Sequence, residues 1–72
     1  MSAVDEEVRD KVLRAVQLTL RSQRITVRVA GRRVFLYGCA YSLEERANLE
    51  TLAMSVPGVS AVENYVFVNL FA

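Results

Sequence analysis

The stretch from Ser42 to Val68, SLEERANLETLAMSVPGVSAVENYVFV, constrains the fold more than any other part of the chain. Glu45 follows Ser42 by three residues, which is the spacing of a capping box at the start of a helix. The helix is predicted to stop at Pro57-Gly58, because proline cannot continue a helix and glycine lets the backbone turn out of it. Beyond this stop the apolar residues alternate with the others, which is the period of a half-buried strand.

The two faces of the predicted helix and strand can be assigned from these periods. The apolar stripe of the helix consists of Leu49, Leu52, Ala53 and Val56. The helix residues predicted to face water are Glu44, Glu45, Arg46 and Glu50. One face of the strand carries Val62, Asn64, Val66, Val68 and Leu70, and the other carries Glu63, Tyr65, Phe67, Asn69 and Phe71. Asn64 is the polar exception on its face, and we expect it to bond backbone at the crossover.

The first part of the chain supplies a helix and a hairpin. Residues 3 to about 20 are predicted to be helical, with Ser2 or Asp5 as the cap. The apolar stripe of this helix is Val8, Val12, Ala15, Val16 and Thr19. A first strand then follows from the alternation of Ile25, Val27 and Val29 with Thr26 and Arg28. The return strand follows from the alternation of Val34, Leu36 and Gly38 with Phe35 and Tyr37. Residues 30–33 form the predicted turn, with Gly31 able to adopt positive φ.

The resulting element order is αββαβ, which predicts an α+β fold. Both helices should cover one face of a three-stranded sheet, giving a two-layer sandwich over a single domain, 1–72. The order of the strands in the sheet stays open. The predicted core consists of Val8, Val12, Val16, Ile25, Val27, Val29, Val34, Leu36, Leu49, Leu52, Val56, Val62, Val66 and Val68.

The chain resembles the BON domain family in several of these segments. The matching runs are Ile25–Val29, Gly31, Val34–Gly38, Ser42–Arg46, Leu52-Ala53, Val56–Val59 and Val62–Asn64. The run VPGV-x-x-V-x-N after a capped helix is the most specific of them. The resemblance implies the αββαβ fold and a non-enzymatic role. It also implies a bacterial envelope or osmotic-stress context, with phospholipid surfaces or envelope components as partners.

The aromatic residues suggest where a partner binds. Five of the six aromatic residues are predicted to point away from the helices, on the sheet face that the chain leaves uncovered. They are Phe35, Tyr37, Tyr65, Phe67 and Phe71. Such a set can form an apolar patch of several hundred Å², a size that marks an interaction site. The leading hypothesis is self-association through this face, since small domains commonly cover excess apolar surface by symmetric pairing.

Two other partners use the same surface. Peripheral binding to a phospholipid membrane would add Arg28, Arg32 and Arg33 as contacts for anionic headgroups. Single-stranded nucleic acid could stack on the aromatic residues. The net charge of only +1 and the element order, which differs from that of the RNA-recognition motif, disfavour nucleic acid. A fold-back of the chain over the face is the remaining alternative.

The sequence contains no set of residues that indicates catalysis. There is no histidine, the commonest general base and metal ligand. Cys39 is the only cysteine, and we expect a small buried or edge thiol. We therefore predict no enzyme, no cofactor, no metal and no small-molecule substrate. The acidic N-terminus does not resemble a signal peptide, which predicts a cytoplasmic location, with envelope association left open if the sequence is a piece of an exported protein.

Overall fold

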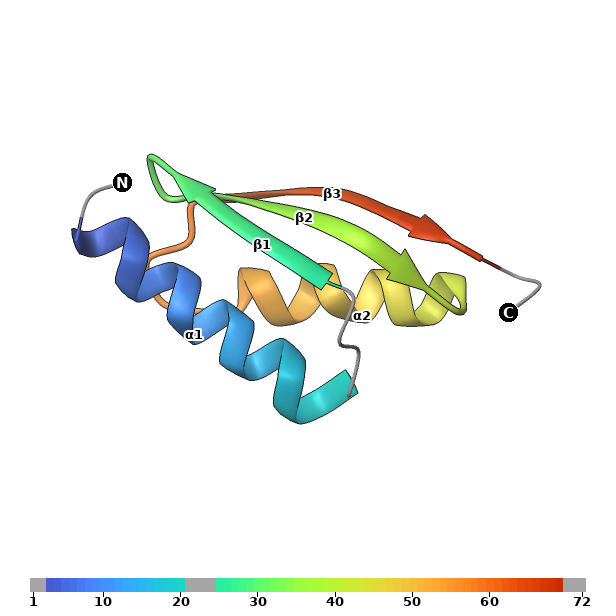
Figure 1. Ribbon diagram of the computed structural model, residues 1–72. Helices are drawn as coiled ribbons and strands as arrows, with labels where there is room; N and C mark the ends of the chain where they lie inside the picture. Colours follow the sequence, from blue (N-terminus) through green and yellow to red (C-terminus); the bar gives the residue numbers. More distant parts are fainter. Residues whose placement is uncertain (1–2, 21–24, 70–72) are drawn as a thin grey trace.

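The computed structural model describes residues 3–20 and 25–69. The elements are helix α1 (Ala3–Leu20), strand β1 (Ile25–Ala30), strand β2 (Arg33–Ala40), helix α2 (Leu43–Met54) and strand β3 (Ala61–Val68). Both helices lie on the same side of the three-stranded sheet (Figure 1). The predicted α+β class and αββαβ order are therefore confirmed.

The strand order, which the sequence left open, is β1-β2-β3. β2 is antiparallel to β1, to which a tight turn connects it, and parallel to β3, which it reaches through α2. This agrees with the rule that antiparallel neighbours can share a short turn whereas parallel neighbours need a crossover. The central strand is thus β2, and β1 and β3 are the two edge strands.

The β1–β2 turn is tighter than predicted. Ala30 and Arg33 are already paired as strand residues, which leaves Gly31 and Arg32 as the two turn residues. Both have positive φ, 56° for Gly31 and 65° for Arg32, as a type I′ hairpin turn requires. Positive φ at Gly31 was predicted. Positive φ at Arg32 was not predicted, because a residue with a side chain seldom adopts this conformation.

Asp5 holds this turn against the first helix. α1 begins at Ala3, so Asp5 lies within its first turn, and the prediction that Asp5 is the N-cap was wrong. The other predicted cap, Ser2, lies outside the described residues. The buried Asp5 carboxylate accepts hydrogen bonds from the backbone N–H groups of Gly31 and Arg32, both at 3.1 Å. These bonds join α1 to the hairpin turn, although the two lie far apart in the sequence.

α2 begins as predicted and ends earlier. The Ser42 hydroxyl accepts a hydrogen bond from the Glu45 N–H at 3.0 Å, while the Glu45 carboxylate accepts one from the Tyr41 N–H at 3.2 Å. The capping box therefore reaches back one residue further than expected. The helix ends at Met54, before the Pro-Gly stop, so Val56 joins the core from the loop rather than from the helix.

The core lies between the sheet and the two helices. Its buried hydrophobic residues are Val8, Val12, Val16, Ile25, Val27, Val29, Val34, Leu36, Ala40, Leu49, Ala53, Val56 and Val66. Three predicted members, Leu52, Val62 and Val68, are only half-buried. Val62 and Val68 lie near the two ends of an edge strand, where fewer neighbours cover them. Ala40 and Ala53 are buried core residues that the predicted core did not include.

Candidate functional site

One face of the sheet carries no helix, and we call it the open face (Figure 1). It consists of the strand residues that alternate with the core residues. Its members are Thr26, Arg28 and Ala30 on β1, Arg33, Phe35, Tyr37 and Cys39 on β2, and Ala61, Glu63, Tyr65 and Phe67 on β3. Within β1, β2 and β3 the predicted strand faces are therefore confirmed, and with them the position of the aromatic residues of these strands relative to the core.

Four of the five aromatic residues predicted as the contact surface lie together on the open face. Tyr37 and Tyr65 are register partners on adjacent strands, and their rings stack with centroids 5.5 Å apart and planes 15° from parallel. Phe67 is the most exposed of the four, with 67% of its surface accessible. Phe35 is half-buried. The fifth residue, Phe71, lies outside the described residues. A ridge of rings thus runs along β2 and β3.

The charged residues of the open face form a defined arrangement beside this ridge. Arg28 and Glu63 are both register partners of Phe35, so the three residues form one row across the sheet. Arg33 begins β2 instead of lying in the turn, and its guanidinium is 3.4 Å from the Glu63 carboxylate. Arg28 forms no ion pair within the described part of the chain. Glu63 was not among the predicted site residues.

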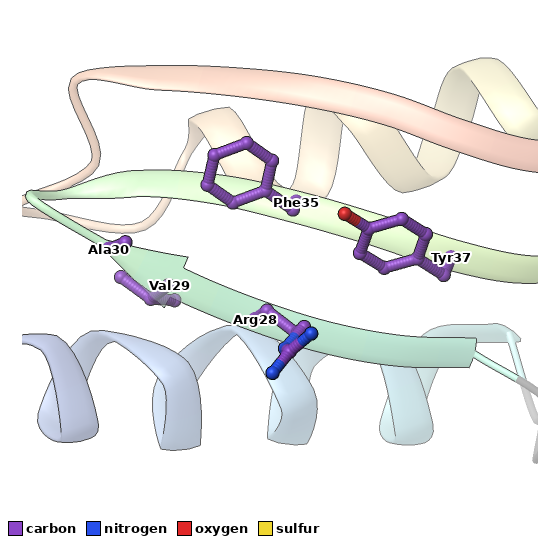
Figure 2. Close-up of a pocket in the computed structure, with 5 residues that line it drawn as sticks. All are labelled: Arg28, Val29, Ala30, Phe35 and Tyr37. Atoms are coloured by element: carbon purple, nitrogen blue, oxygen red, sulfur yellow. The ribbon is translucent and has the colours of Figure 1, made fainter. Parts of the chain in front are cut away.

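Arg28 also borders a hollow in the open face. The hollow has a volume of about 410 Å³ and is lined by Arg28, Val29, Ala30, Phe35 and Tyr37. Figure 2 shows the Arg28 side chain lying over β1 with its guanidinium on the side away from the rings of β2, and the Tyr37 hydroxyl directed along β2 toward Phe35. The hollow thus brings a guanidinium and two rings to the same part of the open face, and such groups bind anionic or planar molecules through charge and stacking.

Both edges of the sheet are bonded by arginines from the underlying helices. On β1, the Val27 carbonyl accepts a hydrogen bond from the Arg9 guanidinium at 3.3 Å. On β3, the Arg46 guanidinium donates to the carbonyls of Val66 and Asn64, at 3.0 and 2.8 Å. Unpaired backbone groups at a sheet edge invite another strand to add. The two arginines occupy several of these groups, so they oppose association through the edges.

Asn64 completes the contact between α2 and β3. Its amide nitrogen donates to the Arg46 carbonyl at 2.9 Å, and its amide oxygen accepts from the Val66 N–H at 3.1 Å. The prediction that Asn64 bonds backbone is confirmed. The prediction that Arg46 faces water was wrong, because its side chain is drawn onto the β3 edge.

Cys39, expected to be a small buried or edge thiol, lies on the open face of the central strand, so the edge position is corrected. It is half-buried, and its sulfur is 3.7 Å from the Ala40 carbonyl oxygen. Within residues 3–20 and 25–69, no group of three His, Cys, Asp or Glu residues could hold a metal ion. The described helices include none that is both long and apolar enough to cross a membrane.

The two helices on one side of the sheet and the aromatic residues on the other define a small two-layer α+β domain with one uncovered sheet face. A sequence model of the BON domain matches residues 4–69, nearly the whole chain. The protein therefore belongs to the BON domain family, whose members are non-catalytic binding domains. No curated protein matches the chain.

Proposed function

We propose that this BON domain is an interaction module that binds a second copy of itself through the open face. The observation that carries the proposal is the exposed aromatic ridge, in which Tyr37, Tyr65 and Phe67 have accessible fractions of 39%, 57% and 67%. Aromatic side chains contribute most to interface energetics because each buries a large apolar area. Pairing two such faces removes this area from water without a change of fold.

The sheet edges support pairing through the face. A three-stranded sheet can also associate by adding a strand at an edge. Arg9 and Arg46 already bond outward carbonyls of β1 and β3, so a new strand would have to displace two charged donors. The open face has no such protection.

The solution mass of the chain tests this proposal. Light scattering over a range of concentrations is expected to show a dimer that dissociates on dilution. Phe67→Lys should raise the dissociation constant at least tenfold, which corresponds to about 1.4 kcal/mol, because it places a charge in the apolar contact. The matched control is Met54→Lys, since Met54 is also exposed but lies on α2, away from the open face. A monomer at all concentrations, or equal effects of both variants, would contradict the proposal.

Phospholipid surfaces are a second candidate partner, and the conformation of Arg32 favours them. The left-handed region costs a residue with a side chain about 1–2 kcal/mol, and glycine avoids this cost. Arg32 nonetheless occupies this position with its side chain exposed, next to Arg33 and near the Arg28 hollow. Retained strain of this kind points to a role for the side chain. A basic turn beside exposed aromatic rings suits an anionic membrane surface.

Arg32→Gly separates this role from folding. The variant is expected to unfold at higher temperature, because glycine relieves the strain, yet to bind vesicles of phosphatidylcholine and anionic phosphatidylglycerol more weakly in a sedimentation assay. Wild-type binding should weaken with added salt, since surface charges are screened. Arg14→Ala is the control, because it removes an exposed arginine of α1. Vesicle binding that Arg32→Gly leaves unchanged would exclude the turn as a lipid contact.

A further inference from the structure

The row Arg28–Phe35–Glu63 gives the open face opposite charges on its two edge strands. Arg28 lies on β1, Glu63 lies on β3, and Phe35 lies between them on the central strand. Within the chain, Glu63 pairs with Arg33 on the neighbouring strand, while Arg28 has no acidic partner among the described residues. The face therefore carries a basic edge and an acidic edge at the same height along the strands.

We infer that the second copy binds face to face with the two-fold axis parallel to β2, so that each Arg28 meets the partner's Glu63. This inference rests on the self-association proposed above and specifies its geometry. A two-fold rotation about an axis along β2 leaves the position of each residue along the strand direction unchanged. It exchanges the positions of the two edge strands, β1 and β3. β1 then lies over β3 of the other copy, and the row repeats in reverse order. Two identical ion pairs result, as an isologous interface requires.

The other simple two-fold arrangement lacks this complementarity. With the axis perpendicular to the strands, β1 of one copy lies over β1 of the other. The open-face residues of β1 are Thr26, Arg28 and Ala30, and none of them is acidic. Arg28 would therefore lack an opposite charge, and Glu63 would lie over the β3 strand of the partner. Because like or unpaired charges in an interface are unfavourable, charge pairing selects the axis along β2.

Residues of the central strand also have defined positions in this geometry. Tyr37 lies on the axis and faces its own symmetry mate, flanked by Tyr65 at one edge and Thr26 at the other. Arg33 also meets its mate, but it lies at the start of β2, is half-exposed, and is already paired with Glu63 at 3.4 Å. It can thus turn toward solvent while the rings stay in contact.

The size of the face is adequate for a specific contact. Three strands about 4.8 Å apart, two of them about 26 Å long and β1 about 20 Å long, present several hundred Å² per copy once their side chains are included. Two such faces reach the total of about 1,000 Å² at which interfaces become specific. Aligned sheets of this kind pack about 10 Å apart, a distance that long side chains such as Arg and Glu can span.

Charge reversal tests the geometry, and the two single variants can be mixed. Arg28→Glu places two acidic pairs across the proposed interface, and Glu63→Arg places two basic pairs there. Each variant alone should have a dissociation constant raised at least tenfold. In an equimolar mixture, Glu at position 28 of one chain meets Arg at position 63 of the other, and the native charges pair at the second contact. The mixture is therefore expected to form heterodimers close to wild-type strength, as measured by light scattering with one chain fused to a mass tag.

Each outcome separates this inference from the proposed function. A wild-type chain that stays monomeric would overturn both. A wild-type dimer that resists both reversals, or variants that weaken the dimer without rescue on mixing, would overturn the geometry and leave self-association standing. Circular dichroism of each variant establishes that the fold is kept.

Cys39 supplies a second readout, which reports how closely the central strands of the two copies approach each other. It lies on β2 and therefore near the axis, where the two copies of the thiol should face each other across the interface. It is also the only cysteine in the chain. A short bismaleimide crosslinker should join two wild-type chains in high yield and the Arg28→Glu variant in low yield. Equal yields would contradict the axis along β2.

Discussion

Replacing Asp5 by alanine is expected to lower the free energy of unfolding by about 3–6 kcal/mol, because two hydrogen bonds to an ionised group are lost and each contributes about 1.5–3 kcal/mol. Asp5 accepts two of them, from the Gly31 and Arg32 N–H groups at 3.1 Å. A chain of 72 residues has a total stability of only about 4–11 kcal/mol. The substitution should therefore be among the most damaging single changes in α1. Urea denaturation followed by circular dichroism measures the loss.

Two further variants show whether the loss comes from this contact. Asp10→Ala removes an exposed carboxylate of the same helix, whose side chain is 69% accessible, and it should change stability by less than about 0.5 kcal/mol. Asp5→Asn keeps the shape but loses the charge and one acceptor oxygen, so it should resemble Asp5→Ala more than wild type. Equal losses for Asp5→Ala and Asp10→Ala would show that the turn does not depend on the carboxylate.

The backbone elements were predictable because local rules determine them. Ser42 has the right side chain to cap α2, Gly31 the right backbone to begin the turn, and the alternation in β1 and β3 assigns each residue to a face. Such signals depend on neighbours within a few residues. The aromatic ridge followed from the same alternation, since a strand has only two faces.

The contacts that span the fold were not predictable in this way. In the sequence, Arg9 and Arg46 look like solvated residues on amphipathic helices, and Asp5 looks like a helix cap. In the structure each bonds backbone 18 or more residues away. Nothing in the spacing of a charged residue tells which distant carbonyl or N–H group it will reach, because that depends on how the helices lie on the sheet.

The charged part of the site depended on two facts that the sequence left undetermined. The row Arg28–Phe35–Glu63 exists only because β2 lies between β1 and β3. Arg33 belongs to the open face only because the turn contains two residues instead of four. With a two-residue turn, Arg33 is the first residue of β2. With a four-residue turn, the same residue would lie exposed in the turn. Strand order and turn length together decide which charges share a face.

Replacing Arg46 by alanine is expected to lower the free energy of unfolding by about 3–6 kcal/mol, because two charge-assisted hydrogen bonds, each contributing about 1.5–3 kcal/mol, are lost at the β3 edge. Those bonds reach the Val66 and Asn64 carbonyls at 3.0 and 2.8 Å. Arg46→Lys should recover only part of the loss, since an ammonium group cannot reproduce the planar fork that bonds two carbonyls. Thermal and urea denaturation of the three chains give the ranking.

A second consequence of Arg46→Ala distinguishes a general loss of stability from a loss of protection at the β3 edge. With the Asn64 and Val66 carbonyls unbonded, β3 offers acceptors to another strand, so the variant should aggregate faster than wild type when each is incubated at the same degree of unfolding. Arg14→Ala, which removes an exposed arginine of α1, should change neither stability nor aggregation. An Arg46→Ala chain that loses stability but aggregates at the wild-type rate would restrict Arg46 to holding α2 on β3. Faster aggregation would show that Arg46 also protects the β3 edge against the addition of another strand.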